Sequence, residues 1–402
     1  MIRHRVKVTG IGPVTPAGIG REAFFRGINE NVSRVREINR FDEAAGHFIA
    51  AEIVDFKITD WIAGGSGAKK LPRQTQFAMV GTILAMADAG LTVADLKGTE
   101  PVVINGSSLM DPELTQRTIA GVAMKGPRAA VPSVIFEAPP SAVAGRISSL
   151  LETRCRTTAL QSACCAGIDA IGHGAEMIAS GQAEIAFCCG TEAPIFYQPM
   201  LELSVAKLSP RNARRPEEMG RPFDLWRNTG VIGEGACVVI LEAEHSPRPA
   251  YAWLAGYAYG NDAAGLAGSG LRETMIMALA NAGRRALDVD FINAWGPGHA
   301  EIDRAEAGAL CEVFGARMSR IPAVSLKGAI GNPLGAAGAI QVASTVLSLK
   351  TGRIPPTVNW TTPDPECPLN LSAEARDIGC STAIVNAHGL SGTNATIVLR
   401  RT

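Results

Sequence analysis

The sequence has no excess of charge, because its 402 residues carry 38 basic and 38 acidic side chains, and it has few aromatic residues, about 5%. A balanced charge provides no electrostatic attraction for nucleic acid, so we expect no nucleic-acid partner. No apolar stretch reaches the length of a membrane span, and the first residues lack the charged-then-apolar pattern of a signal peptide. We therefore expect a cytoplasmic protein with no membrane partner.

The nine cysteines have no spacing typical of zinc ligands. Four of them stand in two adjacent pairs, at 164–165 and 188–189, and adjacent cysteines are poor disulfide partners. We predict reduced thiols that lie mostly in the core, with no metal site and no bound cofactor. The 43 glycines and the 47% hydrophobic content favour an α/β protein with many tight turns.

Short apolar runs alternate with longer alanine-rich segments, and runs that are apolar throughout are typical of strands buried on both faces. The predicted strands are residues 6–10, 102–105, 158–160, 185–189, 236–241, 253–257, 291–294, 323–325, 383–387 and 395–399. The predicted helices are residues 77–89, 167–180, 273–287, 303–314 and 336–349. A buried strand, a small-residue turn and a long helix follow one another at 160–167 and again at 325–338. This repetition suggests a duplicated α/β architecture.

Cys164 stands where an apolar strand passes through small residues into a helix, within residues 157–167. A thiol at a helix N-terminus lies at the positive end of the helix dipole, which would stabilise the thiolate and lower the pKa of Cys164. Nucleophilic catalysis uses this arrangement. Alternatively, Cys164 and Cys165 are simply small buried side chains, and this segment by itself is compatible with both interpretations.

Four further segments occur in order along the chain: VTGIGPVTPAG at 8–18, GRPFDLWRNTGVIGEGA at 220–236, KGAIGNPLGAAG at 327–338 and NAHGLSGTN at 386–394. Together with the cysteine segment, they resemble the β-ketoacyl-acyl carrier protein synthase family over essentially the whole chain. The resemblance implies a thiolase-type fold, almost always dimeric. In this fold two pseudo-equivalent α/β halves, here 1–244 and 245–402, form a five-layered αβαβα core.

The resemblance also implies roles for individual residues. It places Cys164 at the position of the nucleophile, and it assigns the oxyanion hole to the backbone N–H groups of Cys164 and Leu390. Leu390 lies in the loop from Gly389 to Gly392. The implied substrates are acyl groups carried on phosphopantetheine, either of an acyl carrier protein or of CoA.

The two histidines that the family uses for decarboxylative condensation are absent. Trp295 and Asn332 stand at their positions, in NAWGP at 293–297 and GNPLG at 331–335. An indole donates one hydrogen bond but cannot accept a proton, and its size would fill the space of a malonyl group. Asn332 keeps a donor but is no base. We therefore expect that the chain does not perform standard condensation.

Two other histidines stand at neighbouring motif positions. Pro297 and His299 replace threonines that bind the phosphopantetheine arm in the family, which weakens the expected carrier-arm contact. Leu390 replaces the gating phenylalanine, and His388 replaces the first phenylalanine of the same motif. His299 or His388 could serve as a substitute base, or both could be structural.

Lys327, Asp303 and Glu306 match the polar network of the family, whereas Gln341 replaces a glutamate. This set is either part of a catalytic machinery or a buried ion-pair network that holds the fold. Residues 107–110 are expected to line the pocket near a partner subunit.

Three functions remain open. The favoured one is a partner subunit like the chain-length factors of type II polyketide synthases, which form a heterodimer with an active ketosynthase and shape its acyl tunnel. The second is an acyltransferase in which Cys164 takes up an acyl group and passes it on without decarboxylation, and which could be a homodimer. The third is a non-enzymatic acyl-binding protein.

Overall fold

The computed structural model describes residues 4–41, 46–62, 67–262 and 269–402. Among these residues eleven strands form one sheet, in the order β11-β10-β14-β15-β9-β1-β8-β7-β5-β6, with β2 (Gly18–Ile19) paired to β1. The strands of the first half are β1 (Val6–Thr15), β5 (Val102–Gly106), β6 (Arg156–Leu160), β7 (Ile185–Glu192) and β8 (Gly235–Ala243). Those of the second half are β9 (Ala252–Asn261), β10 (Phe291–Asn293), β11 (Ala323–Val324), β14 (Thr382–His388) and β15 (Thr393–Arg401).

The two halves of the sheet have the same topology. Their orders, β1-β8-β7-β5-β6 and β9-β15-β14-β10-β11, place equivalent strands at equivalent positions. Strand directions also agree, because the first two pairings of each half are antiparallel and the next two are parallel. The halves join where Val6, Lys7 and Val8 of β1 pair with β9. The duplication expected from two short segments therefore extends over the whole sheet.

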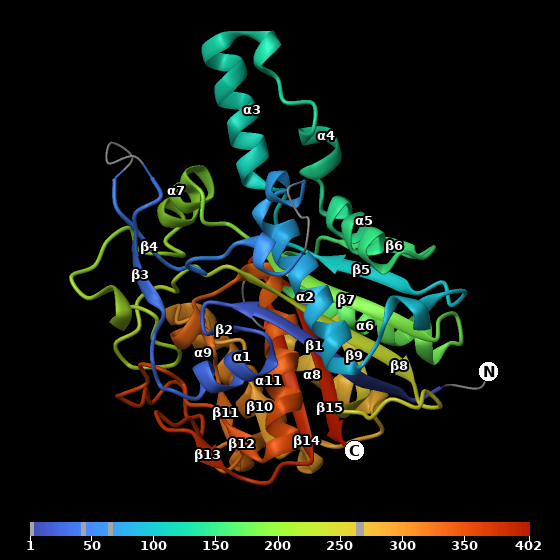
Figure 1. Cartoon of the computed structure of the whole chain (residues 1–402). Coiled ribbons are helices and arrows are strands. Elements are labelled where there is room, and N and C mark those ends of the chain that lie inside the picture. The colour runs from blue at the N-terminus through green and yellow to red at the C-terminus, as the bar shows by residue number, and fades with distance from the viewer. Residues whose placement is uncertain (1–3, 42–45, 63–66, 263–268) are drawn as a thin grey trace.

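Helices cover both halves of the sheet and fill the space between them (Figure 1). The central layer consists of α6 (Ala166–Ala179) and α11 (Ala337–Thr351), and both helices contact strands of the two halves. The outer layers are α2 (Arg73–Ala89) with α5 (Pro140–Leu151), and α8 (Ser269–Asn281) with α9 (Ala300–Phe314). The result is the expected αβαβα arrangement.

The remaining elements lie around this body. They are α1 (Arg21–Ile28), α7 (Tyr197–Val205), α10 (Lys327–Ile330), and the two-stranded pairs β3 (Val35–Ile38) with β4 (Phe48–Ala51) and β12 (Arg353–Ile354) with β13 (Arg376–Asp377). Helices α3 (Pro112–Lys125) and α4 (Val134–Glu137) project from the layers as an arm, which we define as residues 111–138 (Figure 1). Among the described helices none is both long and apolar enough to cross a bilayer.

The predicted strands and helices all occur, with most ends shifted by a few residues. The helix predicted at 273–287 ends earlier, at Asn281. Gly283 follows with a φ of 60°, and this left-handed conformation stops the helix. Helices α1, α3, α4, α5, α7 and α10 were not predicted, because they are short or carry polar faces without a long apolar pattern.

Small residues let the two central helices approach each other at their N-termini. A Cβ atom on Gly167 would lie 2.6 Å from the carbonyl oxygen of Gly335, and one on Gly338 would lie 2.4 Å from a side-chain carbon of Ile168. Helix α11 is buried from Ala337 to Leu349, as expected for a helix without a polar stripe. This contact brings the turn before α6 against the turn before α11.

We expect Gly167→Ala to lower the free energy of unfolding by about 1–3 kcal/mol, because the methyl group overpacks this contact. The control is Gly145→Ala in α5, where a Cβ atom meets nothing within 4 Å. That change should be neutral or stabilise by about 0.5–1 kcal/mol, since alanine favours the helix. Urea unfolding of both variants measures the difference, and equal effects would contradict the importance of the contact.

Candidate functional site

A strained turn places Cys164 at the N-terminus of α6. Strand β6 ends at Leu160, and the chain passes through a short 3₁₀ turn (Ala163–Cys165) into the helix. Ala163 has a φ of 50°, a left-handed conformation that is unfavourable by roughly 1–2 kcal/mol for a residue with a Cβ atom. Leu334, with a φ of 44°, lies in the equivalent turn before α11. Both central helices therefore begin at strained turns that face one another.

The loop between β14 and β15 lies against the cysteine turn. Thr393 donates its hydroxyl to the carbonyl oxygen of Ser162, and a Cβ atom on Gly389 would lie 3.2 Å from the Ala163 methyl group. The backbone N–H groups of Cys164 and Leu390 both reach the Cys164 sulfur, and both lower the pKa of this thiol. Two backbone amide groups thus lie beside the sulfur.

The thiol of Cys164 is nevertheless protonated at neutral pH. Burial raises the pKa of Cys164 to about 12, and the nearby charge of Glu192 adds to the rise. The charge of Lys327 and the two amide groups oppose this rise but do not overcome it. The prediction of a lowered pKa at this helix N-terminus is therefore wrong, because desolvation of the thiolate outweighs the helix dipole.

Cys164 lines a cavity of only about 30 Å³. At about 10–15 Å³ for each water molecule, this space holds roughly two waters. Trp295, whose residue surface is 2% exposed, forms part of the wall. The cavity lining contains seven residues singled out in the sequence: Cys164, Trp295, Asn332, Pro297, His299, His388 and Leu390. The structure therefore brings these seven together, with no space for an acyl chain between them.

Trp295 is fixed by buried charged groups. Its backbone N–H donates to one carboxylate oxygen of Glu306 at 2.8 Å, and the N–H of Gly296 donates to the other at 2.8 Å. The ammonium nitrogen of Lys327 lies 4.0 Å from the centre of the indole ring, which is a cation–π contact. The indole is thus a packed part of the core.

Lys327 and Gln341 connect the site to the sheet. The Lys327 ammonium donates to Oε1 of Gln341 at 2.9 Å, and Nε2 of Gln341 donates to the carbonyl oxygens of Ala294 and Asn386. Burial lowers the pKa of Lys327, and the charge of Glu306 opposes this shift. These contacts hold strand β14 beside the segment that follows β10, so the network supports the scaffold around Trp295.

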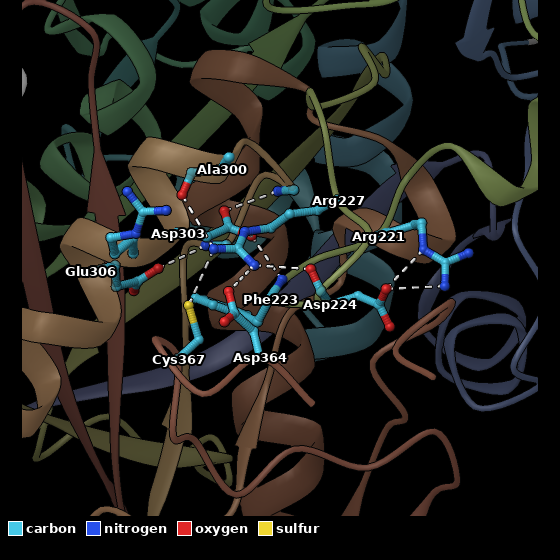
Figure 2. Close-up of polar contacts among 12 residues, drawn as sticks. Arg221, Phe223, Asp224, Arg227, Ala300, Asp303, Glu306, Asp364 and Cys367 are labelled. Carbon is cyan, nitrogen blue, oxygen red and sulfur yellow. Dashed lines mark hydrogen bonds and ion pairs between the residues drawn. The ribbon is translucent and has the colours of Figure 1, made fainter. Parts of the chain in front are cut away.

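Asp303 belongs to a second buried network (Figure 2). Its carboxylate accepts hydrogen bonds from the N–H groups of Phe223 at 2.7 Å and Gly298 at 3.0 Å. It lies 3.6 Å from Nε of Arg227, whose guanidinium also pairs with Asp364. Asp303 therefore fastens the loop before α9 to the segment that contains Phe223, and it does not line the cavity.

Asn332 and the two histidines reach the cavity from different elements. Asn332 is half-buried in the turn before α11, and its side-chain oxygen accepts from the N–H of Leu334 at 3.3 Å. His299 precedes α9, and burial lowers its pKa. His388 ends strand β14, and its Nδ1 lies 2.7 Å from Oδ1 of Asn394.

Glu192, at the end of β7, is a buried carboxylate that the sequence analysis missed. It accepts hydrogen bonds from the N–H groups of Ser108 at 2.6 Å, Leu109 at 3.2 Å and Gly335 at 3.2 Å, and from the hydroxyl of Ser107 at 3.1 Å. It thereby ties the segment after β5 to the turn before α11. A glutamate two residues after the apolar run IAFCCG was the available signal.

Comparison with known families agrees with this architecture. The family model of the β-ketoacyl synthase N-terminal domain matches residues 3–246, and that of the β-ketoacyl synthase C-terminal domain matches residues 251–361. The chain belongs to the β-ketoacyl synthase family. The resemblance inferred from the sequence motifs is therefore confirmed.

Relatives of this ketosynthase-like chain include the putative polyketide beta-ketoacyl synthase 1 of Streptomyces virginiae, which is 31% identical over 99% of the chain and 98% of the relative. The 3-oxoacyl-[acyl-carrier-protein] synthase 2 of Coxiella burnetii is 32% identical over 100% of the chain and 99% of the relative. A structure of the ishigamide ketosynthase/chain length factor matches with a TM-score of 0.92 at 28% identity, covering 100% of both chains. The thiolase-type fold is confirmed, and the chain is a ketosynthase-like protein of polyketide or fatty acid synthesis.

We expect Glu192 to make the stability of this ketosynthase-like chain depend on pH. Burial raises the pKa of Glu192 from 4.5 to about 7. Its stabilising contribution is therefore complete below about pH 4.5 and is lost as the pH rises through 7. At about 1.4 kcal/mol for each pKa unit, the loss amounts to roughly 3 kcal/mol.

Urea unfolding of wild type and Glu192→Gln at pH 4.5, 6 and 8 isolates this contribution from other titrating groups. The unfolding free energy of wild type minus that of Glu192→Gln should fall as the pH rises, because only wild type carries the carboxyl group that titrates. A difference that is independent of pH would show that Glu192 does not titrate in this range.

Proposed function

We propose that this ketosynthase-like chain is a non-condensing partner subunit, similar to a chain-length factor, of an active ketosynthase. The cavity of about 30 Å³ beside Cys164 carries this proposal. A malonyl thioester has no space next to the sulfur while Trp295 forms the wall. Neither an indole nor an amide can transfer a proton as imidazole does, so decarboxylation is left without its acid–base groups.

Two surfaces support the partner role. Strand β6 is the last strand in the order, and its neighbour among the described strands is β5. A free strand edge is a template for pairing with another chain. The arm also presents large apolar side chains to solvent, including Ile135 at 75% and Phe136 at 71% exposed. Exposed apolar groups gathered on a projecting element mark an interaction site.

The known relatives support the assignment of partners and carriers. One matched structure is named a ketosynthase/chain length factor, and one relative is named for a substrate on acyl carrier protein. For this chain we propose a heterodimer with an active ketosynthase that processes acyl-phosphopantetheine, on acyl carrier protein or CoA. Residues 107–110, held by Glu192, would lie near that partner.

An acyltransferase that uses Cys164 is the second candidate. The two amide groups that lie beside the Cys164 sulfur favour it, because they would stabilise the oxyanion of an attacked thioester. This activity needs neither of the missing histidines for decarboxylation. A non-enzymatic protein that binds long acyl chains is not supported, since a cavity of about 30 Å³ holds no such chain.

We expect the purified wild-type chain to leave malonyl-acyl carrier protein intact, at the background rate of the uncatalysed thioester. The double variant Trp295→His with Asn332→His should gain decarboxylation, because general acid–base groups contribute about 10²–10⁴-fold to such steps. Trp295→Phe alone is the control, which frees space without adding a base. Mass spectrometry of the carrier protein follows acetyl formation, and rapid turnover by wild type would refute the non-condensing role.

We expect the chain to co-purify in a one-to-one complex with a ketosynthase encoded beside it. Phe136→Asp on the arm should weaken the complex about tenfold or more, which is about 1.4 kcal/mol, since aromatic side chains dominate interfaces. Met277→Asp, at a position on α8 that is 53% exposed, is the control and should leave the affinity unchanged. Analytical ultracentrifugation measures the affinity of each variant for the ketosynthase. The absence of a complex, or equal effects of both changes, would count against the partner role.

A further inference from the structure

His388 has a buried ring nitrogen without a partner. The residue is 4% exposed and lines the same cavity as Cys164. Its Nδ1 lies 2.7 Å from Oδ1 of Asn394, whereas its Nε2 has no hydrogen-bond partner in the described part of the chain. A buried polar atom that bonds to nothing destabilises the fold, so its presence at a candidate site calls for a functional explanation.

The neighbours of Asn394 determine which nitrogen of His388 carries the proton. Nδ2 of Asn394 donates to the carboxylate of Asp262 at 3.2 Å and to the carbonyl oxygen of Gly392 at 3.0 Å. The other side-chain atom of Asn394 is therefore the oxygen, which can only accept. Nδ1 of His388 must then be the donor. In the neutral ring this leaves Nε2 with a free lone pair at the cavity.

Cys164 needs a base, and apart from the two histidines the groups around the cavity do not provide one. Its thiol is protonated at neutral pH because burial raises its pKa. Trp295 and Asn332 have no basic nitrogen. The amine of Lys327 is engaged by Gln341 and by the indole ring. His299 also lines the cavity and has a buried ring nitrogen without a partner, Nδ1, but no hydrogen bond of the described residues fixes its ring as Asn394 fixes that of His388.

We propose that His388 accepts the proton of Cys164 and thereby enables the thiol to take short acyl groups from pantetheine thioesters. The Cys164 sulfur forms a bond to the thioester carbonyl carbon while its proton passes through a water molecule of the cavity to Nε2 of His388, because the sulfur and Nε2 line one cavity without a direct hydrogen bond. The bond between that carbon and the carrier sulfur then breaks, and His388 returns the proton to the departing thiolate. No oxidation, reduction or loss of carbon dioxide is involved, so the two missing histidines are not required.

The surroundings determine which acyl groups fit. The amide groups of Cys164 and Leu390 would hold the carbonyl oxygen during the attack. With about 30 Å³ available, the acetyl group is the smallest suitable acyl substrate. Leu390 lines the cavity and is 38% exposed, so it borders both the cavity and the solvent. Asn394 acts as a positioning residue for His388.

Acylation of the full chain by acetyl-pantetheine tests this proposal, with intact-mass spectrometry as the readout. Wild type should gain one acetyl group and Cys164→Ala none. His388→Phe and His388→Gln should each react at least about 100-fold more slowly, the lower range for loss of a general base. His173→Gln is the control, because that histidine lies on α6 outside the cavity and should leave the rate unchanged. Melting curves establish that each variant is folded.

The pH dependence separates a proton-transfer role from a structural one. The wild-type rate should level off well below the thiol pKa of about 12, whereas in both His388 variants it should keep rising about tenfold for each pH unit. Equal rates in wild type and the two variants, or no acylation of wild type, would overturn the proposal. Loss of the reaction in His299→Gln but not in the His388 variants would also overturn it. Partner binding is measured separately, so failure of one proposal leaves the other standing.

Discussion

The contact between the N-termini of α6 and α11 is the constraint on which the site depends. Gly167 and Gly338 allow these helices to meet at a distance that any Cβ atom would prevent. Because each helix follows a strained turn, the contact places the Cys164 turn of one half against the Asn332 turn of the other. The duplicated sheet orients both helices, and the β14–β15 loop closes the space above them.

Burial then decides the chemistry of the groups collected there. The carboxylates of Glu306 and Glu192 and the ammonium of Lys327 are used to hold backbone and to pack the indole of Trp295. These contacts hold the scaffold around Trp295. Burial of the Cys164 thiol raises its pKa and keeps it protonated. A family architecture built for condensation is thus retained with a different balance of charges.

Much of the fold could be predicted from the sequence, because strands buried on both faces are apolar throughout and the motifs fix the order of the elements. The sequence also placed Trp295, Asn332, His299, His388 and Leu390 at one site. It did not reveal the shift in the pKa of Cys164, since desolvation depends on side chains from both halves. The carboxylate of Glu192 and the fixed ring of His388 were missed for the same reason. Their partners, Gly335 and Asn394, approach only in the folded chain.

The exposed arm has a consequence for the protein as it is made in the cell. Ile135 and Phe136 lie in solvent on an element that the body of the chain does not cover. A copy released from the ribosome without a partner protein would expose these apolar side chains. Quality-control proteases and chaperones act on such exposed apolar surfaces. The supply of this chain would therefore have to be matched to that of whatever covers the arm. Synthesis of the two proteins from one message would achieve that match.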